Sequence, residues 1–182
     1  MDNKPLKDPN PLPRLGHRYL EWTAYGLLIL LAFILQTTPH LIPPIFGAKP
    51  LLMIPMTIAV AMFTGPVGGA AAGIACGLLW DLYSTRLLGF NALILLAVGC
   101  AAGLLIQLLI RNNLLSALLL ILPSLLLQGL LDWAFNYVLL AKEGALFWLL
   151  RGILPNLLYT LAVSPLIYGA VLLAAKLLKR RE

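Results

Sequence analysis

The chain has 182 residues, of which 61% are hydrophobic and 11% are charged, and its mean hydropathy is +0.93. A soluble domain of this length carries about a quarter charged residues, so the composition excludes an ordinary soluble protein and predicts a polytopic membrane protein. The net charge of +6 comes largely from basic residues near the two ends of the chain. Basic residues that flank apolar segments are typical of topology signals at a lipid bilayer, so we expect no nucleic-acid partner.

Residues 1–20 contain several prolines and lack the apolar core and cleavage region of a signal peptide. We expect residues 1–20 to form a disordered cytoplasmic tail and residues 21–182 to form one membrane domain. Apolar segments of about 20 residues can each cross a bilayer, and we expect six transmembrane helices in an all-α bundle. The expected spans are 21–38, 50–64, 67–83, 91–110 and 114–141, with the sixth after Pro155 in the apolar stretch 145–178.

Six spans place both termini on the same side of the membrane. In that arrangement nine of the 13 Lys and Arg residues lie on the side of the termini, and the more basic side is normally the cytoplasm. The nine residues are Lys4, Lys7, Arg14, Arg18, Arg111, Lys176, Lys179, Arg180 and Arg181. We therefore expect cytoplasmic termini, with the loops at 39–49 and 141–146 on the outside.

Glycines recur at four-residue spacing through the third expected span, and Asp81 occupies the next step of the same register. The glycines are Gly65, Gly69, Gly73 and Gly77, and the fourth span adds Gly99 and Gly103. Small residues on one helix face allow helices to approach closely in lipid, where there is little hydrophobic drive to pair them. This pattern predicts a helix-packing face, used either inside the bundle or for docking another protein.

Polar residues also recur at four-residue spacing in the fifth and sixth expected spans. They are Ser124, Gln128, Asp132 and Asn136 in the fifth span, and Asn156, Thr160, Ser164 and Tyr168 in the sixth. Residues at this spacing share a helix face. Because unpaired polar groups are costly in hydrocarbon, we expect both rows to face the bundle interior.

Two carboxylates and two guanidinium groups are expected at one level in the outer half of the membrane, namely Asp81, Asp132, Arg86 and Arg151. Their charges balance, which favours a structural polar network. An unpaired carboxylate at that depth is costly, so we expect Asp132 to pair with Arg151 or, failing that, with Arg86. A ligand pocket is the alternative interpretation.

Catalysis is the third interpretation of these carboxylates, because two aspartates that share a proton can activate water. The segments GLLWD and GLLDW lack the GxGD motif of intramembrane aspartyl proteases, however. Cys76 and Cys100 are isolated in apolar segments without metal-ligand spacing, and the chain has no Ser/His pair or phosphate-binding loop. We therefore expect a protein that is not an enzyme, with no catalytic residue, no cofactor and no metal site.

The segment GLLWDLYSTRLLGFNAL resembles the central motif of the rod shape-determining MreD family, with matches at Gly77, Asp81, Gly89 and Ala92. The segment LLDWAFNYVLL is similar to a second family motif and contributes Asp132. The length of the chain, the Leu-Gln pair that ends the first span and the basic C-terminal end also agree. The resemblance covers residues 21–181.

The resemblance implies a multi-pass subunit of the bacterial cytoplasmic (inner) membrane that is not catalytic and supports lateral peptidoglycan synthesis and cell shape. It implies MreC and other cell-elongation proteins as partners, and it leaves a homodimer open. The family is thought to share a six-helix fold with the substrate-binding S components of energy-coupling-factor vitamin transporters. An S component is therefore the alternative function, although the expected outer loops are short and few polar residues could line a vitamin pocket.

Overall fold

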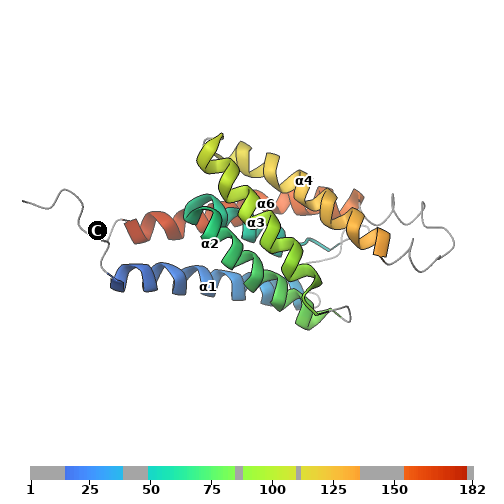
Figure 1. Ribbon diagram of the computed structural model, residues 1–182, viewed down its shortest axis with the longest axis horizontal. Helices are drawn as coiled ribbons and strands as arrows, with labels where there is room; N and C mark the ends of the chain where they lie inside the picture. Colours follow the sequence, from blue (N-terminus) through green and yellow to red (C-terminus); the bar gives the residue numbers. More distant parts are fainter. Residues whose placement is uncertain (1–14, 39–48, 85–87, 110–111, 136–153, 180–182) are drawn as a thin grey trace, which may run out of the picture.

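The computed structural model describes residues 15–38, 49–84, 88–109, 112–135 and 154–179, and every regular element in these ranges is helical (Figure 1). The helices are α1 (Leu15–Thr37), α2 (Met53–Tyr83), α3 (Phe90–Leu108), α4 (Leu114–Trp133) and α6 (Leu154–Lys179). All five are long and apolar enough to cross a membrane. The prediction of an all-helical membrane protein is therefore confirmed, whereas the six-span count and the S-component-like bundle are not.

Helix α2 covers the residues that were expected to form the second and third spans. Its continuity is interrupted at Gly65, where φ is +79° and ψ is −169°. Ala61, before this point, packs against Gly69, after it, since a Cβ atom on Gly69 would lie 2.5 Å from the Cβ atom of Ala61. In a straight helix these two residues would lie about 12 Å apart along the axis, at 1.5 Å per residue, so α2 folds back on itself at Gly65. We call residues 53–64 and 66–83 the first and second limbs of this hairpin.

The turn between the limbs leaves one carbonyl without its helical partner, and a residue from another element supplies it. Residue 66 is proline and has no N–H to donate to the carbonyl of Met62. The Nδ2 atom of Asn112 donates to that carbonyl at 2.9 Å, and the hydroxyl of Tyr168 donates to Asn112 Oδ1 at 3.2 Å. A free backbone carbonyl would be costly in lipid, so the α3–α4 connection and α6 stabilise the turn.

The start of α2 is held in a similar way by side chains of α1 and α6. Gln36 accepts hydrogen bonds from two backbone N–H groups, and Asn156 and Thr160 accept one each from residues just before the helix. The donors are Leu52 (2.7 Å) and Met53 (3.2 Å) to Gln36 Oε1, Lys49 (3.0 Å) to Asn156 Oδ1, and Leu51 (3.0 Å) to Thr160 Oγ1. The end of α1 and the starts of α2 and α6 therefore meet at one end of the bundle.

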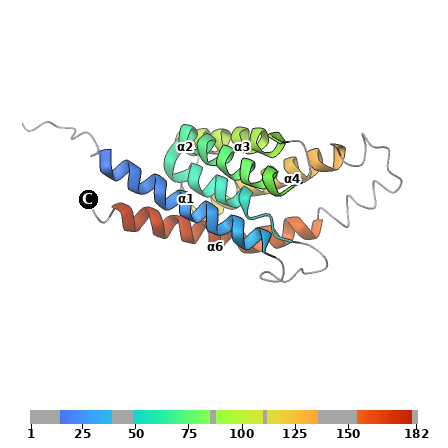
Figure 2. The same ribbon diagram turned by 90° about the horizontal axis from the view of Figure 1, so that it is seen from below.

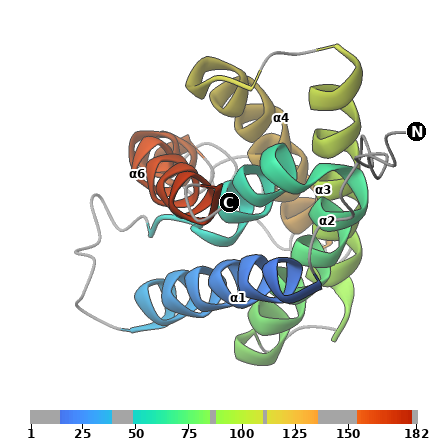
Figure 3. The same cartoon turned by 90° about the vertical axis from the view of Figure 1, so that its left-hand side faces the viewer.

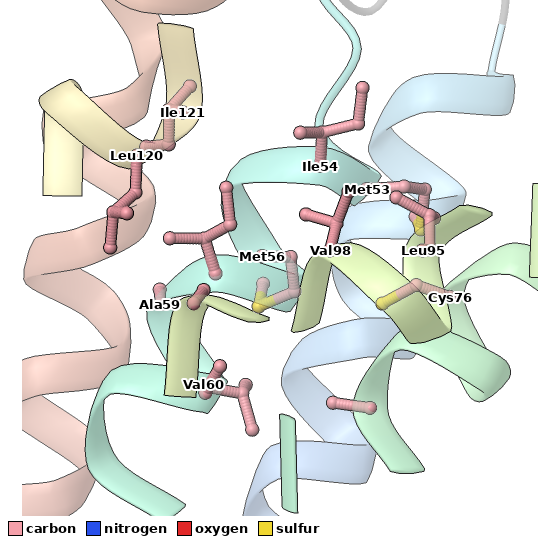
Figure 4. Packing of buried hydrophobic residues seen from close by; sticks show 14 of the residues in the cluster. Met53, Ile54, Met56, Ala59, Val60, Cys76, Leu95, Val98, Leu120 and Ile121 are labelled. Atoms are coloured by element: carbon pink, nitrogen blue, oxygen red, sulfur yellow. The ribbon is translucent and has the colours of Figure 1, made fainter. Parts of the chain in front are cut away.

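The core forms around the first limb of α2, where residues 53–62 are all buried. Figure 4 shows side chains of this limb between Leu120 and Ile121 of α4 and Leu95 of α3, and all of these residues belong to one buried apolar cluster. The long helices α1 and α6 run in opposite directions on the outside of this core (Figures 2 and 3). Only 17% of the spanning window of α1 and 22% of that of α6 are buried, so both helices present large apolar surfaces to lipid.

Candidate functional site: a buried polar network and a glycine interface

Asp81, in the last turns of α2, lies against the start of α3 and is only 2% exposed. Its Oδ2 accepts hydrogen bonds from the backbone N–H groups of Gly89 (2.8 Å) and Ala92 (3.2 Å). Its Oδ1 accepts from the backbone N–H of Asn91 (3.2 Å) and from Asn91 Nδ2 (2.8 Å). The first N–H groups of a helix have no partner within the helix, and the helix dipole favours an acidic group there. Asp81 therefore caps α3 from the neighbouring helix.

Gly89 makes this cap geometrically accessible. It occupies the N-cap position of α3 with φ +97°, a left-handed conformation that costs other residues roughly 1–2 kcal/mol. A Cβ atom at Gly89 would meet none of the described residues within 4 Å, so among these residues it is the backbone conformation and not crowding that requires glycine. The turn directs the Gly89 N–H toward the Asp81 carboxylate, eight residues earlier in the chain.

The network continues from Asp81 through Asn91 to α4. Asn91 is fully buried, and its Oδ1 accepts a hydrogen bond from Nε2 of Gln128, which is 3% exposed. Because Asn91 Nδ2 donates to Asp81, its carbonyl oxygen is left to accept from Gln128. The second polar atom of the Gln128 amide, Oε1, is buried and has no hydrogen-bond partner among the described residues. Three helices are thus joined at one level by Asp81, Asn91 and Gln128.

The predicted four-charge network is only partly within the described residues. Asp132 lies half-buried in the last turn of α4, one helical turn beyond Gln128. Arg86 and Arg151 lie outside the described residues, so the expected pairing of Asp132 with either arginine stays a prediction. The structure adds Asn91, which the sequence analysis did not select. Its position two residues after the motif glycine, at the start of an apolar helix, was the available signal.

The glycine face of α2 packs directly on the backbone of α3. A Cβ atom on Gly69 would overlap the Gly99 carbonyl, and one on Gly99 would overlap the Gly69 carbonyl. Gly73 meets the backbone of Leu95 in the same way, and Gly77 meets the backbone of Ala92. At the other end of the interface, Gly103 lies against the backbone of the hairpin turn, where Gly65 itself lies close to the Gln107 side chain.

This contact occupies the glycine face within the chain itself. The register of the interface also explains the placement of Asp81, because it is one helical turn beyond Gly77 and so meets the first residues of α3. Because the two backbones approach closely, the Asp81 carboxylate lies within hydrogen-bond distance of the backbone N–H groups at the start of α3. The glycine stripe and the polar network are therefore two parts of one α2–α3 joint.

The Asp81 carboxylate takes part in this joint as a hydrogen-bond acceptor. All four hydrogen bonds to the carboxylate come from groups at the start of α3, and the residue is only 2% exposed. Among the described residues, no three His, Cys, Asp or Glu side chains lie close enough together to hold a metal ion. Hydrogen bonds and close glycine contacts thus connect α2 to α3.

The model of a family described as rod shape-determining protein MreD matches residues 17–176. No curated protein and no solved structure matches the chain.

Proposed function

Since the chain belongs to the MreD family of rod shape-determining proteins, whose family model matches residues 17–176, we propose that it is a membrane subunit of the bacterial cell-elongation complex. In this proposal it binds MreC, supports lateral peptidoglycan synthesis and performs no catalysis of its own. The family match is the observation that carries the proposal. The structural argument concerns what the motif residues of this chain do.

The residues that resemble the central family motif form one physical unit. Gly77 allows α2 to lie on the backbone of α3, Asp81 caps α3, and Gly89 supplies the left-handed turn between them. The fourth residue, Ala92, donates its N–H to Asp81. Each motif residue thus has an architectural role in the α2–α3 joint. A buried and fully hydrogen-bonded carboxylate supports a scaffold more than an active site.

The proposed location is the bacterial cytoplasmic membrane, with both termini in the cytoplasm. Exposed aromatic side chains lie near both ends of the bundle, as expected at membrane interfaces: Tyr19 and Trp22 at the start of α1, and Tyr83 at the end of α2. The α2 hairpin returns to the side from which it starts, whether or not its first limb crosses completely. With α1, α3, α4 and α6 each crossing once, the two termini come to the same side.

Reporter fusions test this topology. Alkaline phosphatase fused after Thr38 is expected to be active, and a fusion after Glu182 is expected to be inactive, because the enzyme folds only outside the cytoplasm. Fluorescent-protein fusions at the same positions serve as the reciprocal control. An active phosphatase at the C-terminus would contradict the even number of crossings.

The partner proposal is tested by co-expression with MreC. Affinity-purified protein is expected to retain MreC through detergent extraction, and mass spectrometry of the complex is expected to show no small molecule in stoichiometric amount. An S component would give the opposite pattern, with a vitamin carried through purification and MreC absent. The Gly169→Ala variant adds a methyl group at an open position on α6. We expect this variant to fold and to retain MreC as the parent protein does.

A further inference from the structure

Helix α4 (Leu114–Trp133) is weakened in its middle at two successive residues. Pro123 lies inside the helix and is exposed, and proline has no N–H to donate to the carbonyl of Leu119, four residues earlier. The hydroxyl of Ser124 donates to the carbonyl of Leu120 at 2.7 Å, and such contacts slightly destabilise helices and often bend them. Sharp helix kinks occur at prolines, so a hinge in α4 is expected at Pro123.

The two halves of α4 on either side of Pro123 are packed to different extents. Four residues of the first half are buried, namely Ser116, Ala117, Leu120 and Ile121. Figure 4 shows Leu120 and Ile121 beside the first limb of α2. In the second half, which we define as residues 124–133, Leu125 and Gln128 are buried, and residues 129–133 are half-buried or exposed. Segments with few buried apolar contacts open most readily, so the second half is the part that a hinge at Pro123 releases.

Gln128 fastens the second half of α4 to the start of α3. Its Nε2 donates to Asn91 Oδ1, and the ring of Phe135, just past the helix, meets the ring of Phe90 edge-on with centroids 5.0 Å apart. The other polar atom of the amide, Gln128 Oε1, is buried and has no hydrogen-bond partner among the described residues. A buried acceptor without a donor is costly. A displacement that brings a donor to Oε1 removes this cost in exchange for the bond to Asn91, so two positions of the half-helix lie close in free energy.

We propose that the second half of α4 pivots at Pro123 between a latched position, in which Gln128 bonds to Asn91, and a released position farther from α3. The hinge, the sparse packing beyond it and the unpartnered amide oxygen are three separate features of the same half-helix. Because Asn91 also donates to the Asp81 carboxylate, release removes a donor from the network that caps α3. The position of α4 is thereby coupled to the α2–α3 joint. This inference goes beyond the cell-shape function and does not rest on it.

Distances between paired spin labels test the pivot, measured by pulsed electron paramagnetic resonance on the full chain in lipid nanodiscs. Both native cysteines are replaced by alanine, and the labels are attached at exposed leucines. Leu126→Cys and Leu130→Cys, on the second half of α4, are each paired with Leu93→Cys on α3. Leu119→Cys, before the hinge, is paired with Leu104→Cys as the control. We expect two distances for each pair that includes the second half and one distance for the control pair.

Three substitutions separate a latched hinge from other motions. Pro123→Ala restores the missing backbone donor and is expected to leave one distance for each pair. Gln128→Met keeps the length of the side chain but cannot donate to Asn91, so the ratio of released to latched molecules is expected to rise about three- to tenfold, the effect of one net hydrogen bond. Leu127→Met, at an exposed neighbouring position, is the matched control and is expected to leave the ratio unchanged.

One narrow distance for every pair in the parent protein would overturn the proposal. Broadening at Leu130 alone would also overturn it, because that is the pattern of a fraying helix end. Two distances that persist in Pro123→Ala would contradict the hinge, and equal effects of Gln128→Met and Leu127→Met would contradict the latch. If Gln128→Met does not fold, the comparison of Pro123→Ala with the parent protein decides, since Pro123 is exposed and alanine favours the helix.

Discussion

Replacing Asp81 with leucine is expected to lower the thermal unfolding midpoint of the purified protein by on the order of 10 °C. The substitution removes the acceptor of four hydrogen bonds, three of them from backbone N–H groups at the start of α3. Each buried donor left without a partner costs about 1–3 kcal/mol, and part of this is regained where the structure relaxes. We therefore expect a loss of about 4 kcal/mol, and for a protein of this size each kcal/mol corresponds to roughly 2–4 °C.

The Asp81→Asn variant tests whether residue 81 must accept several hydrogen bonds or whether any polar side chain of the same size is sufficient. Asparagine keeps one acceptor oxygen but turns an NH2 group toward donors, so we expect about half of the leucine effect. Thermal unfolding of both variants in the same detergent provides the measurement. The control is Asn113→Ala, because Asn113 is the exposed N-cap residue of α4 and its side chain makes no capping bond. A leucine variant as stable as the Asn113→Ala control would show that Asp81 does not hold α3.

Gly73→Ala is expected to destabilise the protein by about 2–3 kcal/mol, and Gly73→Leu is expected to prevent accumulation of folded protein. A Cβ atom at Gly73 would overlap the backbone carbonyl of Leu95 and approach the nitrogen of Leu96. Backbone atoms cannot rotate away as a flexible side chain can, so α2 and α3 would have to separate. Separation would also move Asp81 from the N–H groups it caps, which couples the two parts of the joint.

Gly169→Ala is the matched control for the glycine prediction. Gly169 is also inside a helix, and no atom of the part of the chain that the structure describes lies within 4 Å of a Cβ atom built there. Alanine is a better helix former than glycine by about 0.5–1 kcal/mol, so this variant is expected to be as stable as the parent protein or slightly more stable. Folded yield by size-exclusion chromatography and thermal unfolding compare the variants. Equal behaviour of Gly73→Ala and Gly169→Ala would contradict a close α2–α3 packing.

The α2–α3 joint was partly predictable because its parts have local signals. The four-residue spacing of the glycines identified a glycine face. Asp81 follows Gly77 at the same spacing, so it was predicted to lie on that face, shortly before the turn at Gly89. The spacing could not identify α3 as the partner, because glycine stripes look the same whether they pack inside a chain or against another protein. The spacing also could not show that the Asp81 carboxylate accepts hydrogen bonds mainly from backbone N–H groups, because every residue except proline has such a group and the sequence does not distinguish them.

The six-span count illustrates a different limit of sequence patterns. Gly65 and Pro66 correctly indicated a turn. Hydropathy, however, does not show how far a segment extends across the bilayer. The first limb of α2 has roughly 12 residues and a length of about 18 Å, shorter than the roughly 30 Å hydrocarbon core of a bilayer. The burial of residues 53–62 among the other helices explains why this limb is largely apolar on every side. A buried short helix and a short transmembrane span are equally hydrophobic, so composition cannot separate them.

The side chains that support the hairpin were also beyond local patterns. Gln36 and Asn112 satisfy backbone groups of α2 from positions 16 and 50 residues away in the sequence. The four-residue spacing of Asn156 and Thr160 predicted a shared face on α6, but not that this face would bind the main chain of residues 49–51. Such side-chain to backbone contacts depend on the tertiary arrangement and become visible only in the structure.

Depletion of the protein in its native host, followed by microscopy, tests the proposed role in cell shape most directly. We expect cells to lose their cylindrical shape and become spherical within a few generations, and we expect rods to return on expression of the parent protein or of Gly169→Ala. Complementation by Asp81→Leu is expected to fail, because the α2–α3 joint would be lost. Normal rods after complete depletion would contradict a role in cell elongation.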